Sequence, residues 1–237
     1  LGFGQSVQPG GRLDNRLWSR QLQCFLEQIV GKPAVVAGNS LGSLVGLTTA
    51  VFRPELVIAV AAAPLPDPTL LSPLPLRRSP WSRRWQRWLV LLVSRCLPLG
   101  LLVAVLRQNP LLRMGLASAY ASSERIDSEL VQLIRWPASR STAGRALGAM
   151  VRGMALRPAR ATAPQLLLRL NRPLLLLWGR RDRLVPPVIA ERVVQQAPAG
   201  LAELQWLEGL GHCPHDEAPE TFNLALIGWL KQQSPTR

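Results

Sequence analysis

Three short, unbroken runs of apolar residues constrain the fold of this chain more than any other feature. They cover residues 34–37, 56–63 and 173–178, and segments with apolar residues at helical spacing lie between them. Strands buried on both faces have this composition, and such strands are typical of parallel sheets covered by helices on both sides. The sequence therefore predicts an α/β fold with a mostly parallel sheet.

The other core elements follow from periodicity and from helix-breaking residues. Helical spacing predicts helices over residues 13–30, 42–52, 187–196 and 222–230, and a last strand is predicted over 201–207.

A long helical segment interrupts the alternation of strands and helices. Residues 64–80 are dense in proline, and residues 81–168 have irregular helical spacing. We therefore expect an α/β core in two parts, residues 1–63 and 169–237, with a helical lid inserted at 64–168.

Composition supports a folded protein in a reducing compartment. The 237 residues are 48% hydrophobic, which excludes disorder as the main state. The three scattered cysteines form neither a disulfide framework nor a CxxC zinc spacing. The chain begins at Leu1 within a motif and shows no signal or transit peptide. We expect a cytoplasmic protein whose N-terminal strands are missing from this sequence.

A G-x-S-x-G motif lies between the first predicted strand and the following helix, at residues 38–42. A sharp turn in this context lifts a serine side chain clear of the sheet, so Ser40 is the candidate nucleophile. Glycines on both sides, Gly38 and Gly42, are expected to remove Cβ atoms that would clash in the turn. The amide of Leu41 is the expected oxyanion donor, with Asn39 beside it as an oxyanion or substrate residue.

The chain has only two histidines that could serve as the base, His212 and His215. His212 follows the last predicted strand, so its loop can reach the sheet edge at which Ser40 is expected. His215 is expected to help orient that loop. The chain order serine, acid, histidine is typical of this kind of site.

Two aspartates could complete the site. Asp182 follows the strand at 173–178, and a carboxylate there could hold the tautomer of His212 and stabilise its imidazolium form. Asp67 follows the strand at 56–63 within a proline-rich stretch and is the alternative. Asp216 is expected to be a helix cap.

These residues resemble the α/β-hydrolases that carry a lid. Residues 2–6 are similar to the G-F-G-x-S loop after the fourth core strand of that superfamily, and residues 38–42, 178–182 and 211–212 match later landmarks. The resemblance covers nearly the whole chain and implies the α/β-hydrolase fold. One departure is Ser43, where relatives commonly have glycine.

A narrower resemblance concerns residues 211–220, G-H-C-P-H-D-E-A-P-E. With residues 38–42, this string resembles the pheophytinase and chlorophyll dephytylase branch of plastids and cyanobacteria. Membership implies hydrolysis of the phytyl ester of a chlorophyll-type pigment, with Ser40 as nucleophile, His212 as base and Asp182 as acid. It implies an apolar ester as the small-molecule substrate, and neither a metal nor an organic cofactor.

The family's H-G oxyanion loop, which follows its third core strand, has no counterpart in this sequence. Without that strand, the strand at 34–37 becomes a bare apolar edge. Loss of one oxyanion donor costs about 100- to 1000-fold in turnover. A second function therefore stays open, that of a non-catalytic or inactive protein at a membrane surface. A lid hydrolase for another acyl or C–C substrate is a further alternative.

The excess positive charge lies in the expected lid. Residues 77–172 hold 17 arginines and three acidic residues, in a chain whose net charge is +14. Trp81, Trp85 and Trp88 share one helical face, and Arg95 and Pro98 interrupt the apolar run that follows, so no membrane span is expected. The tryptophans either pack the lid on the core or form an apolar, interfacial face. We expect no nucleic-acid binding, and peripheral contact with a membrane of the thylakoid type.

Overall fold

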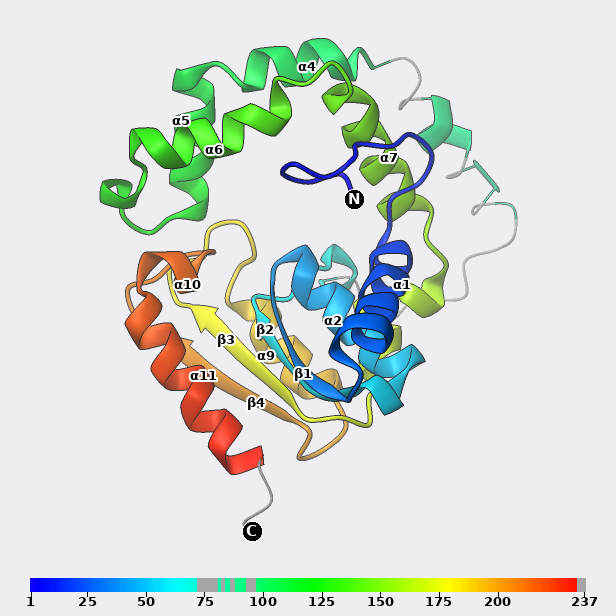
Figure 1. Ribbon diagram of the computed structural model, residues 1–237, viewed down its shortest axis with the longest axis vertical. Coiled ribbons are helices and arrows are strands. Elements are labelled where there is room, and N and C mark those ends of the chain that lie inside the picture. The colour runs from blue at the N-terminus through cyan, green and yellow to red at the C-terminus, as the bar shows by residue number, and fades with distance from the viewer. Residues whose placement is uncertain (72–80, 82–83, 86–87, 93–96, 234–237) are drawn as a thin grey trace.

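A sheet of four parallel strands, in the order β1-β2-β3-β4, forms the centre of the molecule (Figure 1). The structure is a computed structural model that describes the chain except for residues 72–80, 82–83, 86–87, 93–96 and 234–237. The strands are β1 (Ala34–Asn39), β2 (Val57–Ala63), β3 (Leu174–Gly179) and β4 (Ala202–Leu207). The predicted strands and the α/β fold class are confirmed, and β1 lies at an edge of the described sheet.

Helices cover both faces of this sheet. The long helices of the core are α1 (Asn15–Phe25), α2 (Leu41–Phe52), α9 (Val188–Gln196) and α11 (Pro219–Gln233). The shorter helical segments are η1 (Leu26–Val30), η2 (Pro54–Leu56), η3 (Pro68–Leu70), η4 (Ser123–Arg125), η5 (Ala159–Ala161), α8 (Ala163–Leu167) and α10 (Pro214–Glu217). The helix predicted over 13–30 is thus α1 followed by a π-helical turn, η1, which ends at Gly31 with a positive φ of 68°.

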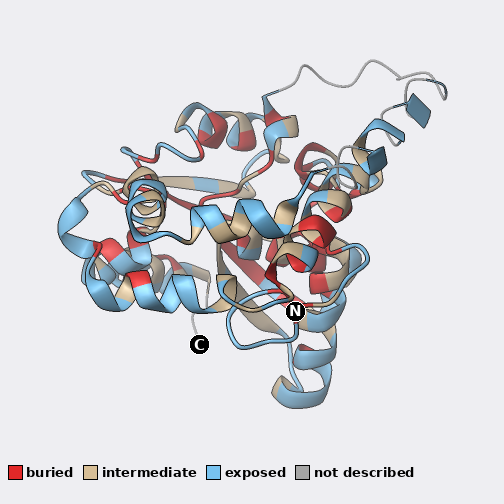
Figure 2. Ribbon diagram, turned by 90° about the horizontal axis from the view of Figure 1, so that it is seen from above, coloured by how far each residue is buried: buried red, intermediate tan, exposed pale blue. Residues whose placement is uncertain are grey.

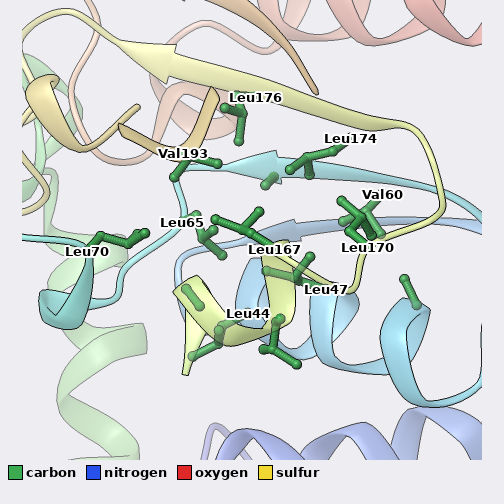
Figure 3. Packing of buried hydrophobic residues seen from close by; sticks show 14 of the residues in the cluster. Leu44, Leu47, Val60, Leu65, Leu70, Leu167, Leu170, Leu174, Leu176 and Val193 are labelled. Atoms are coloured by element: carbon green, nitrogen blue, oxygen red, sulfur yellow. The ribbon is translucent and has the colours of Figure 1, made fainter. Parts of the chain in front are cut away.

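The unbroken apolar runs are explained by side chains that alternate between two cores. On β3, Leu174 and Leu176 face one cluster, which α2, α8 and α9 complete (Figure 3). Leu175 and Leu177 face the other cluster, in which Trp229 of α11 is buried. Because successive strand residues point to opposite faces, a strand covered on both sides needs apolar residues at every position.

The helices of the segment expected to form a lid, for which we keep that name, lie above the carboxyl ends of the strands in the view of Figure 1. It comprises α4 (Leu99–Leu106), α5 (Asn109–Ala119), α6 (Ser128–Ala138) and α7 (Ala143–Leu156). The sequence predicts a lid over residues 64–168, but both ends of this range pack in the core cluster that α2, α8 and α9 complete. The fully buried residues there are Leu65 and Leu70 at one end and Leu166 and Leu167 at the other.

The lid is joined to the core through α7 and the N-terminal segment. Leu13 donates its amide to the carbonyl oxygen of Ala149 at 2.9 Å, and both residues share a small buried cluster with Trp18. A Cβ atom on Gly153 would lie 2.0 Å from the carbonyl oxygen of Leu13, so only glycine permits this approach. None of the helices in the described ranges is both long and apolar enough to cross a membrane.

Candidate active site

Ser40 occupies the turn between β1 and α2 in a strained backbone conformation. Its φ of 52° and ψ of −119° make it the one non-glycine residue with a positive φ in the described part of the chain. Such a conformation costs about 1–3 kcal/mol and persists only where the surrounding structure enforces it. The turn therefore has the backbone geometry that the G-x-S-x-G motif predicts.

The two glycines of the motif have different roles. A Cβ atom on Gly38 would lie 2.4 Å from the carbonyl carbon of Gly42, so glycine is required at position 38. A Cβ atom on Gly42 would meet nothing within 4 Å. The expectation that both glycines prevent a clash is therefore wrong for Gly42, because its missing side chain faces open space.

Ser43, the departure from the family pattern, holds the strand ends together. Its hydroxyl donates to the carbonyl oxygen of Gly38 at 2.6 Å and accepts from the amide of Ala63 at 3.0 Å. The side chain is fully buried, so these bonds satisfy groups that would otherwise lack partners. Ser43 thus connects the end of β1, the end of β2 and the first turn of α2.

His212 is paired with Asp182. Nδ1 of His212 lies 2.9 Å from Oδ2 of Asp182, and both side chains are buried. Oδ1 of Asp182 accepts the amides of Leu184 and Val185, each at 2.8 Å. The carboxylate is therefore fixed in position and can hold the imidazole with Nδ1 protonated, which leaves Nε2 available to accept a proton.

Asp67, the alternative acid, lies in a different environment. Its Oδ2 accepts from Nη2 of Arg157 at 2.8 Å and from the amide of Ala163 at 2.7 Å, while Oδ1 binds Thr69. The side chain is fully buried in these contacts. Asp67 therefore anchors the point at which the chain returns from the lid to the core.

Asn39 differs from the role expected for it. Its Nδ2 donates to the carbonyl oxygens of Ala63 and His212, the latter at 3.0 Å. Both amide hydrogens are thus used, so this side chain is not an oxyanion donor and instead ties the residue before Ser40 to the backbone of His212. Leu41 is the first residue of α2, and its amide bonds no backbone acceptor in the described residues, so it is free to serve as the expected oxyanion donor.

The hydroxyl of Ser40 makes no hydrogen bond within the described residues, so it does not bond Nε2 of His212 in this structure. Catalytic hydrogen bonds in structures without substrate are often long and tighten only in the complex with substrate. Ser40 and His212 nevertheless lie at the same end of the sheet, because Asn39 connects their backbones.

The lid contacts the His212 loop directly. The amide of His212 donates to the carbonyl oxygen of Ala119, the last residue of α5, at 2.7 Å. The hydroxyl of Tyr120 donates to Oδ2 of Asp216 at 2.6 Å. Asp216 lies inside α10, whose N-cap is Cys213, and its carboxylate accepts no backbone amide in the described residues, which corrects its expected role as a helix cap.

Glu217 completes this contact and was assigned no role from the sequence. Its Oε1 accepts the amide of Gly211 at 2.8 Å, and its Oε2 accepts the amide of Ala121 at 2.7 Å. One buried carboxylate thus joins the residue before His212 to the lid. Tyr120, which bonds the adjacent Asp216, is the single tyrosine of the chain, and that is the one sequence signal for this contact.

Burial suppresses the reactivity of the thiol of Cys213, the residue after His212. Desolvation raises the pKa of Cys213 to about 11, and the thiol packs beside the lid cluster of Tyr120, Ile126 and Val131. Cys213 is therefore a neutral packing residue at physiological pH.

His215 lies in α10 with its ring edge-on to Phe222, so it contacts the terminal helix.

No group of three or more His, Cys, Asp or Glu side chains in the described residues is arranged to hold a metal ion. Arg180, two positions before Asp182, is engaged elsewhere, because it pairs with Glu208 at 3.0 Å and lies over the ring of Trp206. This arrangement suits a nucleophilic attack by the Ser40 hydroxyl. His212, held by Asp182, could accept the proton, and the amide of Leu41 could stabilise the negative charge that develops.

Comparisons with known proteins agree with the fold. The model of a family described as the alpha/beta hydrolase family matches residues 1–225. The chain is 28% identical over 242 residues to the chloroplastic pheophytinase of Arabidopsis thaliana, an alignment that covers 97% of this chain and 48% of the relative. The chain therefore spans about half the length of that relative.

Solved structures show the same fold. A thermophilic esterase from Thermogutta terrifontis superposes with a TM-score of 0.68 at 22% identity, over 98% of this chain and 77% of the esterase. An alpha/beta hydrolase from a Medee basin deep-sea metagenome library superposes with a TM-score of 0.72 at 17% identity, over 100% and 78% of the two chains.

Proposed function

The chain belongs to the alpha/beta hydrolase family, and on this premise we propose that it is a serine hydrolase acting on an ester of a bulky apolar substrate. The observation that carries the proposal is the buried pair of His212 and Asp182 beside the strained turn of Ser40. In this proposal, Ser40 is the nucleophile, His212 the base and Asp182 the carboxylate that orients it.

The reaction proceeds through an acyl-enzyme. Oγ of Ser40 attacks the ester carbonyl while Nε2 of His212 takes its proton, and Asp182 stabilises the imidazolium that forms. The carbonyl electrons move onto the oxygen, which the amide of Leu41 stabilises. When the intermediate collapses, the C–O bond breaks and His212 gives the proton to the leaving alcohol. Water, activated in turn by His212, then hydrolyses the acyl-enzyme and regenerates Ser40.

The proposed substrate is the phytyl ester of a chlorophyll-type pigment. Two observations support it, namely the similarity to a pheophytinase over nearly the whole chain and the 211–220 string that this chain carries at its base loop. In this structure the same string forms the contact between the base loop and the lid, through Asp216 and Glu217. A loop joined to the lid in this way connects the chemistry to the element that would cover a long apolar group.

The test uses the purified protein with pheophytin, chlorophyll and p-nitrophenyl butyrate, beside a Ser40→Ala variant. Ser40-dependent release of phytol supports dephytylation. Ser40-dependent cleavage of the small ester alone keeps the serine hydrolase and replaces the pigment by another acyl substrate. Folded protein that turns over none of the three would contradict the proposal and favour the non-catalytic function.

A further inference from the structure

An exposed aromatic face on the lid stands apart from the site described above. Trp81, Trp85 and Trp88 are 71%, 55% and 57% exposed, and their rings contact one another in sequence, with centroids 5.9 Å apart in each pair. Together with Arg84 they line a hollow of about 320 Å³. We call these four residues the tryptophan face. Arg83 and Arg87, which interleave with them in sequence, lie outside the described residues.

The tryptophan face does not serve the packing of the lid. Side chains that joined the lid to the core would be buried, as Trp18, Trp178 and Trp229 are. Further exposed leucines follow in sequence, including Leu101 and Leu102 of α4. In Figure 2 the described residues between 81 and 92 lie at the edge of the molecule and are mostly coloured as exposed. Large exposed apolar groups of this kind mark interaction sites.

The charge around this face identifies the kind of partner. Residues 68–123 contain eight arginines and no acidic residue. Residues 77–172 hold 17 of the 28 basic residues and three of the 14 acidic ones, which leaves 11 of each sign elsewhere. The whole net charge of the chain thus lies in the lid region, so its partner is anionic.

Two other anionic or apolar partners fit less well. A second copy of this chain would bring the same positive charge to the interface, which opposes association. Single-stranded nucleic acid stacks on tryptophan and pairs with arginine, but a polyanion leaves the exposed leucines of α4 in water. A lipid surface covers both features, because tryptophan favours the headgroup region, leucine the acyl region and arginine the lipid phosphates.

We propose that the tryptophan face docks the lid on the surface of an anionic lipid bilayer. This inference does not depend on the proposed catalysis, because neither Ser40 nor His212 belongs to the face. Docking would bring the lid to the surface from which a membrane-dissolved apolar substrate is drawn.

The experiment measures co-sedimentation of the purified protein with vesicles of phosphatidylcholine alone and of phosphatidylcholine with 30 mol % phosphatidylglycerol. We expect binding to the anionic vesicles that weakens with salt. Replacing Trp81, Trp85 and Trp88 together by alanine should reduce the affinity about tenfold or more. Trp136→Ala is the matched control, since Trp136 is 51% exposed but lies on α6, and it should bind as the wild type does.

Further variants keep the test decisive. Arg84→Glu, on an exposed side chain, should weaken binding about fivefold or more, while Ser40→Ala should leave it unchanged. Thermal unfolding of each variant checks that it is folded. The proposal would be overturned if the wild-type protein did not bind anionic vesicles. It would also be overturned if the triple variant and Arg84→Glu both bound these vesicles as tightly as the wild type does. Binding of a single-stranded oligonucleotide through the same tryptophans, without vesicle binding, would replace the lipid by nucleic acid.

Discussion

The backbone amide of His212 donates a hydrogen bond to the carbonyl oxygen of Ala119, at 2.7 Å. The proposed base is therefore attached to the end of a lid helix, although 93 positions separate the two residues in sequence. Glu217 and the Tyr120–Asp216 bond reinforce this attachment on either side. A change at this contact should reach the chemistry through the position of His212.

Glu217→Gln tests this coupling. The variant keeps the shape of the side chain but presents an NH₂ group to one of two backbone amides, so one hydrogen bond is lost. We expect kcat for p-nitrophenyl butyrate to fall about 10- to 100-fold with a smaller change in KM, because the imidazole is displaced. Glu220→Gln, on the exposed first turn of α11, is the control and should retain wild-type kcat. Equal kcat in both variants would show that the lid contact does not position His212.

Asp182→Asn tests the acid. An amide cannot stabilise the imidazolium and favours the wrong tautomer of His212, so kcat should fall about 10⁴-fold. The fold should survive because the amides of Leu184 and Val185 can still bond the side-chain oxygen. Steady-state kinetics with the small ester and a thermal unfolding curve provide the two measurements. Retention of more than a tenth of kcat would rule out Asp182 as the acid.

Asp67→Ala should act on stability and leave the chemistry intact. The change removes the partner of the buried Arg157 guanidinium and leaves the amide of Ala163 without an acceptor. Breaking a buried ion pair in this way costs about 3–5 kcal/mol of unfolding free energy. Urea unfolding measures the loss. If Asp67→Ala instead removed activity from stably folded protein, the assignment of the acid to Asp182 would be contradicted.

Cys213 should resist alkylation. With a pKa of about 11, only about a thousandth of the thiol is ionised at pH 8, and the thiolate is the reactive form. Cys24 is exposed and should react first. Peptide mapping after iodoacetamide treatment at pH 8 distinguishes the sites, and labelling of Cys213 should rise steeply as the pH approaches 11. Equal rates at Cys24 and Cys213 in folded protein would contradict this environment.

The strands and the three proposed catalytic residues could be predicted because each depends on local pattern and chain order. Apolar runs locate the sheet, a G-x-S-x-G turn locates Ser40, and the carboxyl ends of parallel strands bring Asp182 and His212 to the same edge. These inferences need no knowledge of which side chains meet in three dimensions.

The roles that were missed or wrong depend on contacts between distant segments. The bond between Tyr120 and Asp216 spans 96 positions, and the bond between Asn39 and His212 spans 173. Nothing in the local sequence of Asn39 reveals that two carbonyl oxygens occupy its amide group. Likewise, position 42 carries the motif glycine although the structure leaves room there for a side chain.

The central claim is that Ser40 is a nucleophile activated by His212 and Asp182, and a fluorophosphonate probe tests it most directly. Mass spectrometry of the labelled protein should locate the phosphonate on Ser40, and labelling should be lost in Ser40→Ala and strongly slowed in His212→Ala. Ser6→Ala, at an exposed serine of the N-terminal loop, should label as the wild type does. Absence of labelling in folded wild-type protein, or labelling that persists in Ser40→Ala, would contradict the account.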